Sequence, residues 1–237
     1  MIGLGTLINV ALIIASGLAG LLGGRFLTPR VQDTLMKATA VCVLFVGLGG
    51  AMEQMLHVER DHLTSGGTAM MVISMAGGAL IGEVLDLEGL IERLGSWLRK
   101  HTGSEGDTGF VNAFVTASLT VSIGAMAIVG SIQDGIEGDW STLALKGALD
   151  ALIVCVMTAS MGAGCIWSAL PVLVFEGGIT LLARLLQPLM TAAALANLSL
   201  VGNLLIFCVG VNLIHPKIFR VANMLPAVVI AVLLALV

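Results

Sequence analysis

The stretch that decides the fold is residues 143–186, LALKGALDALIVCVMTASMGAGCIWSALPVLVFEGGITLLARLL. It is apolar apart from four charged residues, Lys146, Asp150, Glu176 and Arg184. A helix needs about 20 residues to cross a bilayer, so the stretch is too long for one span and short for two. Its middle holds small residues and a proline: Ser160, Gly162, Gly164 and Pro171. Irregular backbone at membrane depth must be covered by protein or a water-filled cavity. The stretch therefore predicts either a tight helical hairpin or a pair of broken half-helices.

The whole chain has the composition of a membrane protein. Of its 237 residues 57% are hydrophobic and 11% are charged, and the mean hydropathy is +1.04. Soluble domains are about 45–50% apolar and about 25% charged, so a soluble domain, a disordered chain and a nucleic-acid binder are excluded. The 30 glycines favour closely packed membrane helices. We predict one all-α integral membrane domain over residues 1–237, a polytopic bundle whose partner is the lipid bilayer.

Eight apolar segments alternate with polar connections. They cover residues 3–24, 35–52, 67–85, 110–132, 143–161, 166–182, 191–214 and 221–237. The first has no basic residue before its apolar run, so we interpret it as a retained span and not as a cleaved signal peptide. Most Lys and Arg residues fall on one side when there are eight spans and both termini lie outside; Lys146 is then assigned to an outer connection. Merging the fifth and sixth segments gives seven spans and weakens this bias. We favour eight, keep seven open, and expect a multi-pass protein of the bacterial inner membrane.

An internal repeat links two of these segments. Residues 21–29, LLGGRFLTP, are similar to residues 181–188, LLARLLQP, and each copy is followed by a second span. The second spans contain Phe-Val-Gly at residues 45–47 and Cys-Val-Gly at residues 208–210. With eight spans the two hairpins turn on opposite sides of the membrane. The alternatives are an inverted repeat, which many secondary transporters have, and chance similarity between leucine-rich helices.

Two carboxylates inside spans are the first candidates for a functional site. Asp150 lies in the fifth segment and Glu176 in the sixth. A charge in the hydrocarbon region costs at least about 2.5–3.5 kcal/mol on insertion scales, so such residues are candidates for function. Burial disfavours the charged form of a carboxyl group, which can then bind a proton or a cation. The alternative is a structural carboxylate capped by neighbouring helices.

Four more polar residues complete the predicted solute or ion site: Ser131, Gln133, Asp134 and Asn203. The first three follow a run of small residues that starts at Gly124, and they either line the mouth of a cavity or serve helix packing. We expect Asp150 to face the protein interior, near polar groups of the fourth segment or of the segments that contain asparagines. Ser122, Ser131, Gln133 and Asn203 are the available donors.

Several segments in sequence order resemble the YqgA/YdfK-type family of bacterial inner-membrane proteins. They include GAMAIVGSIQDG at residues 124–135, KGALD at 146–150, SALPV at 168–172 and NMLPA at 223–227. The resemblance covers nearly the whole chain. It implies a polytopic bacterial membrane protein, often described as a transport protein, and it implies no substrate and no catalytic residue.

We carry two functional hypotheses. The first is a transporter or channel for a small solute or ion, coupled to protons or sodium through an intramembrane carboxylate. The second is a membrane scaffold or assembly subunit that transports nothing. Homo-oligomerisation fits both. The chain has no HExxH, GxSxG or P-loop motif, so we expect no enzyme activity, cofactor or metal.

Overall fold

The computed structural model describes residues 2–59, 62–122, 124–215 and 217–236. The first half contains α1 (Leu4–Gly24), α2 (Pro29–Met55), β1 (Leu56–Glu59), β2 (His62–Ser65), α3 (Thr68–Leu85), α4 (Leu87–His101) and α5 (Phe110–Ser122). The second half contains α6 (Ala125–Glu137), α7 (Ser141–Met161), η1 (Ala163–Ser168), α8 (Ala169–Leu181), α9 (Ala183–Leu186), η2 (Gln187–Leu189), α10 (Ala192–Ile214), α11 (Val221–Met224) and α12 (Pro226–Leu234). The predicted all-α bundle is therefore confirmed.

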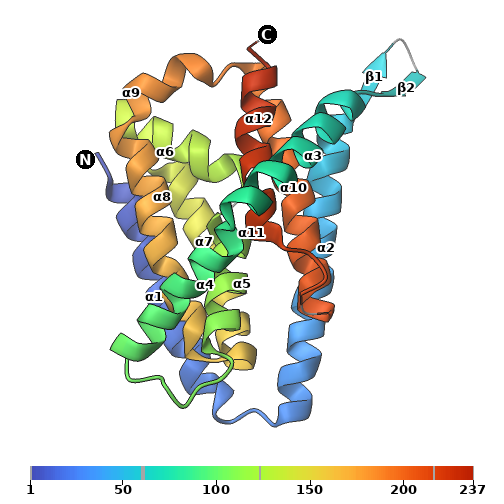
Figure 1. Cartoon of the computed structure of the whole chain (residues 1–237). Coiled ribbons are helices and arrows are strands. Elements are labelled where there is room, and N and C mark those ends of the chain that lie inside the picture. Colours follow the sequence, from blue (N-terminus) through green and yellow to red (C-terminus); the bar gives the residue numbers. More distant parts are fainter. Residues whose placement is uncertain (1, 60–61, 123, 216, 237) are drawn as a thin grey trace.

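The apolar segments run back and forth between two ends of the bundle (Figure 1). Within the described ranges, six helices are long and apolar enough to cross a membrane, or up to seven when α5 and α6 count as one bent span. A shorter apolar helix, Val221–Leu234, follows. Both termini lie toward the upper end of the bundle in Figure 1.

The stretch at residues 143–186 forms a helical hairpin. Helix α7 ends at Met161, and Gly162 follows with φ +95°, a conformation that residues with a side chain rarely adopt. The 3-10 helix η1 then leads into α8. Gly164 in this turn lies against the carbonyl of Phe110, which leaves no room for a Cβ. The predicted break is confirmed, and the alternative of two broken half-helices is wrong, because α7 and the η1–α8 segment each have the length of a span.

The broken helix lies instead in the fourth apolar segment, which the sequence predicts as one span over residues 110–132. The structure divides it into α5 and α6, whose axes differ by 64°. Gly124 precedes α6 with φ +153°. The prediction of a single helix there was wrong, since apolar composition alone does not register the backbone break beside this glycine.

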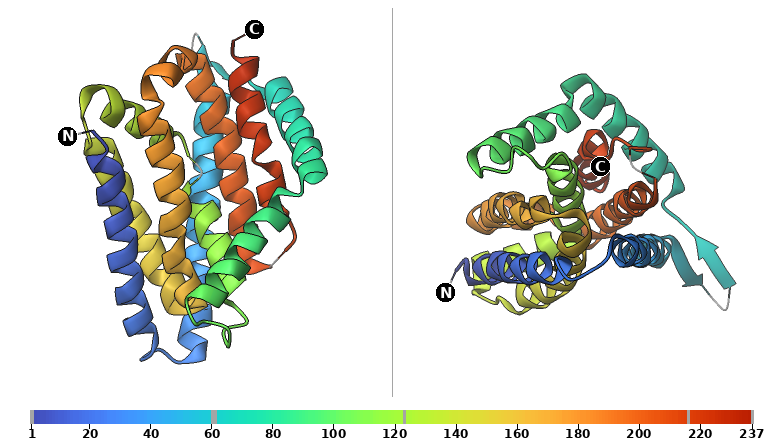
Figure 2. Two further views of the ribbon diagram at one scale, coloured as in Figure 1. Left: turned by 60° about the vertical axis from the view of Figure 1, so that its left-hand side comes forward. Right: turned by 90° about the horizontal axis from the view of Figure 1, so that it is seen from below.

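The helices form two groups, seen end-on in the right panel of Figure 2. In the first group α1 packs along α7, and α8 lies against α1 and α6. In the second group α2 packs along α10, and α3 packs along α12. Helix α5 lies between them and contacts α7, α8 and α10. A core of Ile13, Val121, Val154, Ala169 and Val172 fills the first group beside α5.

The crossing of α2 and α10 supports the inverted repeat. A Cβ on Gly47 would lie 2.6 Å from the backbone nitrogen of Phe207, and a Cβ on Gly210 would lie 2.9 Å from that of Leu44. The alignment that pairs Gly47 with Gly210 also pairs Leu44 with Phe207. The contact is therefore reciprocal, as a two-fold axis between the helices requires. The turn after α1 and the turn after α8 lie at opposite ends of the bundle (Figure 1). We predict that the two hairpins superpose after a two-fold rotation about an axis in the membrane plane.

Two elements lie outside the spans. The first part of the connection between the third and fourth apolar segments forms the amphipathic helix α4. Its apolar side is divided: Leu98 is buried in the core, whereas Leu90 and Trp97 are exposed. The sequence did not predict the hairpin β1–β2, which extends α2 beyond the bundle with Leu56 opposite Ser65 (Figure 1).

Candidate functional site

A buried cluster of charged and polar side chains lies between α1, α7 and α8. Lys146 and Asp150 are 6% exposed, and Glu176 and Asn9 are 0% exposed. The Lys146 ammonium donates to the carboxylate of Asp150 and lies 3.4 Å from Oε1 of Glu176. The amide nitrogen of Asn9 donates to both carboxylates, at 3.2 Å to Asp150 Oδ2 and 2.9 Å to Glu176 Oε1. One ammonium and one amide therefore connect two carboxylates in the interior.

The local sequence explains this meeting point. Lys146 and Asp150 are four residues apart, so they lie one above the other on the same face of α7. Gly147 lies between them, and a Cβ there would come within 2.9 Å of Asn9 Cα. The absent side chain lets α1 approach α7 closely enough for the short Asn9 side chain to reach both carboxylates. Glu176 reaches the same point from α8.

The broken span supplies the third partner of Lys146. Its Nζ donates to the carbonyl oxygen of Val121 at 2.6 Å. Val121 lies in the last turn of α5, where carbonyls lack partners in the helix and the helix dipole is negative. The interruption between α5 and α6 therefore directs a free carbonyl at the buried ammonium, and the break belongs to the site.

The cluster contains polar atoms without a partner. Among the described residues, Glu176 Oε2 and Asn9 Oδ1 are buried acceptors with no hydrogen-bond donor. With all three groups charged, Lys146 contributes +1 and each carboxylate −1, which leaves a net charge of −1. Buried charge is costly unless it is compensated. One bound proton or one monovalent cation would neutralise the cluster.

A line of polar contacts continues from the cluster toward the end that holds the termini. Thr6 and Thr180, one turn further along α1 and α8, place their hydroxyl oxygens 3.5 Å apart. Next, Oδ2 of Asp134 accepts from the backbone N–H of Gly5 at 3.0 Å. Asp134 is fully buried, and its Oδ1 has no partner among the described residues. Three helices thus contribute polar groups along one path.

The structure brings together some of the predicted site residues and separates others. Asp150 faces the interior, as predicted, and meets Glu176. Asp134 joins the same path beyond the threonine pair. Gln133 accepts from the hydroxyl of Thr142 at 2.7 Å, and Ser131 is fully buried with no partner in the described part of the chain.

The expectation that an asparagine-bearing span lies near Asp150 is confirmed by Asn9, but the four donors named for Asp150 were wrong. Asn203 lies on α10 in the other group of helices, where its amide donates to Ser199 and packs against Gly50. None of the hydrogen bonds to Asp150 among the described residues comes from Ser122, Ser131 or Gln133; its donors are Lys146 and Asn9.

Lys146 is the main residue that sequence reasoning missed. It was assigned to a connection, but it lies in the second turn of α7 and is buried. Its spacing of four residues from Asp150 was the available signal, because oppositely charged residues at that spacing pair on a helix. Asn9 had a weaker signal: it is a polar residue in the middle of an apolar helix.

Two known proteins are similar to this chain over nearly its whole length. The chain is 26% identical over 226 residues to "Uncharacterized membrane protein YdfK" of Bacillus subtilis (strain 168), covering 95% of this chain and 93% of that protein. It is also 26% identical over 232 residues to "Uncharacterized protein YqgA" of Escherichia coli (strain K12), covering 96% and 94%. No solved structure matches. The family model described as "Protein of unknown function (DUF554)" matches residues 4–236. The chain is thus a membrane protein that belongs to this family, DUF554.

Proposed function

We propose that the protein is a transporter of a small solute or ion, coupled to a proton or a sodium ion that binds at the Lys146–Asp150–Glu176 cluster. The observation that carries the proposal is the buried pair of carboxylates with a single ammonium between them. A purely structural ion pair needs one carboxylate for one lysine. The second carboxylate creates a place for one exchangeable positive charge.

The surroundings of the cluster support exchange of that charge. Val121 at the end of α5 binds Lys146, so a movement of the broken span changes the partners of the ammonium. The contacts through Thr6, Thr180 and Asp134 form a polar route to one end of the bundle. The reciprocal α2–α10 crossing fits the inverted repeats on which alternating access is built.

The first experiment asks whether the cluster binds a proton. Infrared difference spectra of the purified protein, recorded during a pH titration, report the carbonyl stretch of a protonated carboxylic acid. We expect a band in the wild-type protein that is lost in Glu176→Gln or Asp150→Asn, each of which keeps the shape of the side chain. Glu105→Gln, at an exposed carboxylate in the loop after α4, is the matched control and should leave the band unchanged.

The second experiment measures transport in liposomes that contain the purified protein. A solute panel is screened for flux with an imposed proton gradient, an imposed sodium gradient or neither. We expect gradient-driven flux in the wild type and in Glu105→Gln, and uncoupled or absent flux in Asp150→Asn. Wild-type flux from folded Asp150→Asn would remove Asp150 as the coupling residue. A wild-type protein without the infrared band and without any flux would favour the scaffold hypothesis.

A further inference from the structure

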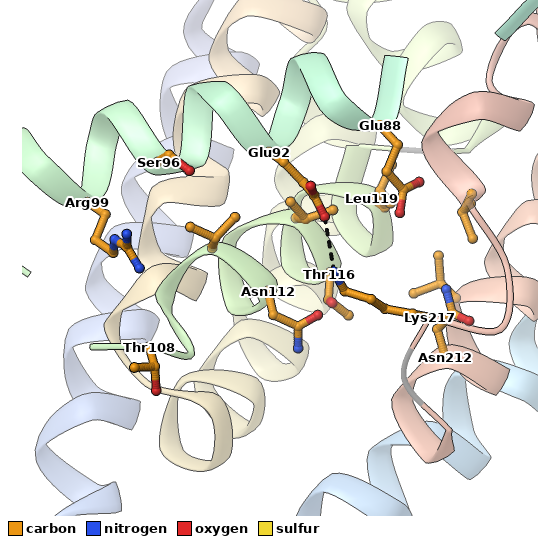
Figure 3. A pocket seen from close by; sticks show the side chains of 14 residues that line it. Glu88, Glu92, Ser96, Arg99, Thr108, Asn112, Thr116, Leu119, Asn212 and Lys217 are labelled. Carbon is orange, nitrogen blue, oxygen red and sulfur yellow. Dashed lines mark hydrogen bonds and ion pairs between the residues drawn. The ribbon is translucent and has the colours of Figure 1, made fainter. Parts of the chain in front are cut away.

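A second polar site lies away from the charged cluster, in a cavity of about 380 Å³ between α4, α5 and α10 (Figure 3). Helix α4 contributes Glu88, Glu92, Ser96 and Arg99 to its lining. The opposite side contributes three polar residues at intervals of four: Thr108, Asn112 and Thr116. The volume lies within the range of about 300–1,000 Å³ that small-molecule sites occupy.

One part of the cavity is already satisfied by contacts within the protein. Lys217 lies 3.3 Å from Glu92, and this ion pair is drawn in Figure 3. The carboxylate of Glu88 accepts from the backbone N–H of Ala222 at 3.2 Å. The Asn212 side chain bonds the backbone of Phe219 in both directions, at 2.7 and 2.9 Å. Lys217, Glu92 and Asn212 therefore have partners within the protein, and the Glu88 carboxylate has a backbone donor.

The other part of the cavity is rich in unused donors. Across the described ranges, Arg99 makes no ion pair, and its buried Nε has no hydrogen-bond partner. The nearby side chains of Ser96, Thr108 and Asn112 also make no hydrogen bond within this part of the protein. A guanidinium presents paired N–H groups that match the two oxygens of a carboxylate. Hydroxyl and amide groups beside it add further donors.

The remaining lining is aliphatic and selects the kind of anion. Five apolar side chains complete the cavity: Val111, Val115, Leu119, Val209 and Val221. An inorganic anion would leave this apolar surface without a contact. A short hydrocarbon chain attached to a carboxylate would fill it and remove it from water. A single uncommitted cation, Arg99, matches a single negative charge.

From these features we infer that the cavity is a binding site for a short-chain organic monocarboxylate, held by Arg99 and its neighbouring donors. Arg99 pairs with the carboxylate, and the valine and leucine side chains contact the hydrocarbon part. Binding at this site does not depend on the charged cluster; only the statement that the bound anion is the transported solute rests on the proposed function.

The test uses the full-length protein in lipid nanodiscs and radiolabelled butyrate as the probe, without any ion gradient. We expect saturable binding that is not displaced by butyramide, butylammonium or phosphate. Arg99→Gln should weaken it about tenfold or more, because hydrogen bonds to charged groups contribute at that scale. Arg99→Lys keeps the charge but loses the planar guanidinium, so its affinity for butyrate should lie between those of the wild type and Arg99→Gln. Lys100→Gln, at the exposed neighbouring position of α4, should bind as the wild type does.

The inference is overturned if folded wild-type protein binds no butyrate, if Arg99→Gln binds it equally well, or if phosphate competes as well as butyrate does. Asp150→Asn should retain butyrate binding. Since no gradient enters this measurement, binding without coupled flux would overturn the proposed function alone, and coupled flux without butyrate binding would overturn this inference alone.

Discussion

Replacing Lys146 with methionine tests whether the buried cluster is held together by its single ammonium. The side chain of Lys146 is 7% exposed, and those of Asp150 and Glu176 are 9% and 1% exposed. Methionine has a similar length and no charge. The change removes the ammonium from two buried carboxylates, which keep only the Asn9 amide as a donor among the described residues, and from the Val121 carbonyl. It moves the net charge of the cluster from −1 to −2. Removing one partner of a buried ion pair costs about 3–5 kcal/mol of unfolding free energy.

The exposed pair Asp33–Lys37 provides a control of the same chemistry. It also joins a lysine and an aspartate four residues apart, with a distance of 2.7 Å, but its side chains are 61% and 54% exposed. Exposed pairs of this spacing contribute about 0.3–0.5 kcal/mol. We therefore expect Lys37→Met to leave stability nearly unchanged while Lys146→Met lowers it by several kcal/mol.

Unfolding by sodium dodecyl sulfate, followed by circular dichroism in mixed micelles, measures both variants. The loss in Lys146→Met should shrink as the pH falls, because protonating a carboxyl group removes the uncompensated charge. It should also shrink in the double variant with Asp150→Asn, which removes one of the orphaned carboxylates. If Lys146→Met lies within about 1 kcal/mol of the wild type at neutral pH and shows no added pH dependence, the cluster does not carry the charge imbalance that we assign to it.

The remaining predictions concern packing, pH and topology. Gly47→Ala should lower the free energy of unfolding by about 1–3 kcal/mol through overpacking against α10. Gly49→Ala lies on the same helix, where a Cβ meets nothing within 4 Å, and should raise the free energy of unfolding by about 0.5–1 kcal/mol. Chemical denaturation of the two variants measures the difference. Burial raises the pKa of Glu88 above its ordinary 4.5, partly offset by the hydrogen bond from Ala222. The folded state therefore binds this proton at higher pH than the unfolded state does, so stability should fall as the pH rises from 4.5 through the raised pKa; unfolding midpoints across this range should fall less in Glu88→Gln. Reporter fusions at the C-terminus and within residues 102–107 should report opposite sides of the membrane, and fusions that report the same side would contradict the bundle in Figure 1.

Much of the fold was predictable because bilayer physics constrains the sequence strongly. A span must be apolar over about 20 residues and must satisfy its backbone internally, so composition and length locate the helices. The hairpin at Gly162 followed from the same reasoning. The break between α5 and α6 did not, because a helix interrupted beside Gly124 has the same apolar composition as a continuous one.

The sequence could identify the residues of the site that are energetically costly in a membrane, but not their partners. Asp150 and Glu176 were identifiable because each is expensive in a membrane wherever its partners lie. The identity of those partners depends on which helices pack together, and residues 9, 146 and 176 are brought into contact only by the tertiary structure. Lys146 shows why counting the Lys and Arg residues of each connection is a poor guide to membrane orientation when a residue lies near the end of a helix. When Lys146 is counted as an outer residue, it reduces the excess of positive charge on the inner side over the outer side. With Lys146 in the interior, Arg184 in α9 is the basic residue that remains at the outer end among the described residues. The burial that makes Lys146 part of the site thus also strengthens the charge bias that assigns both termini to the outer side.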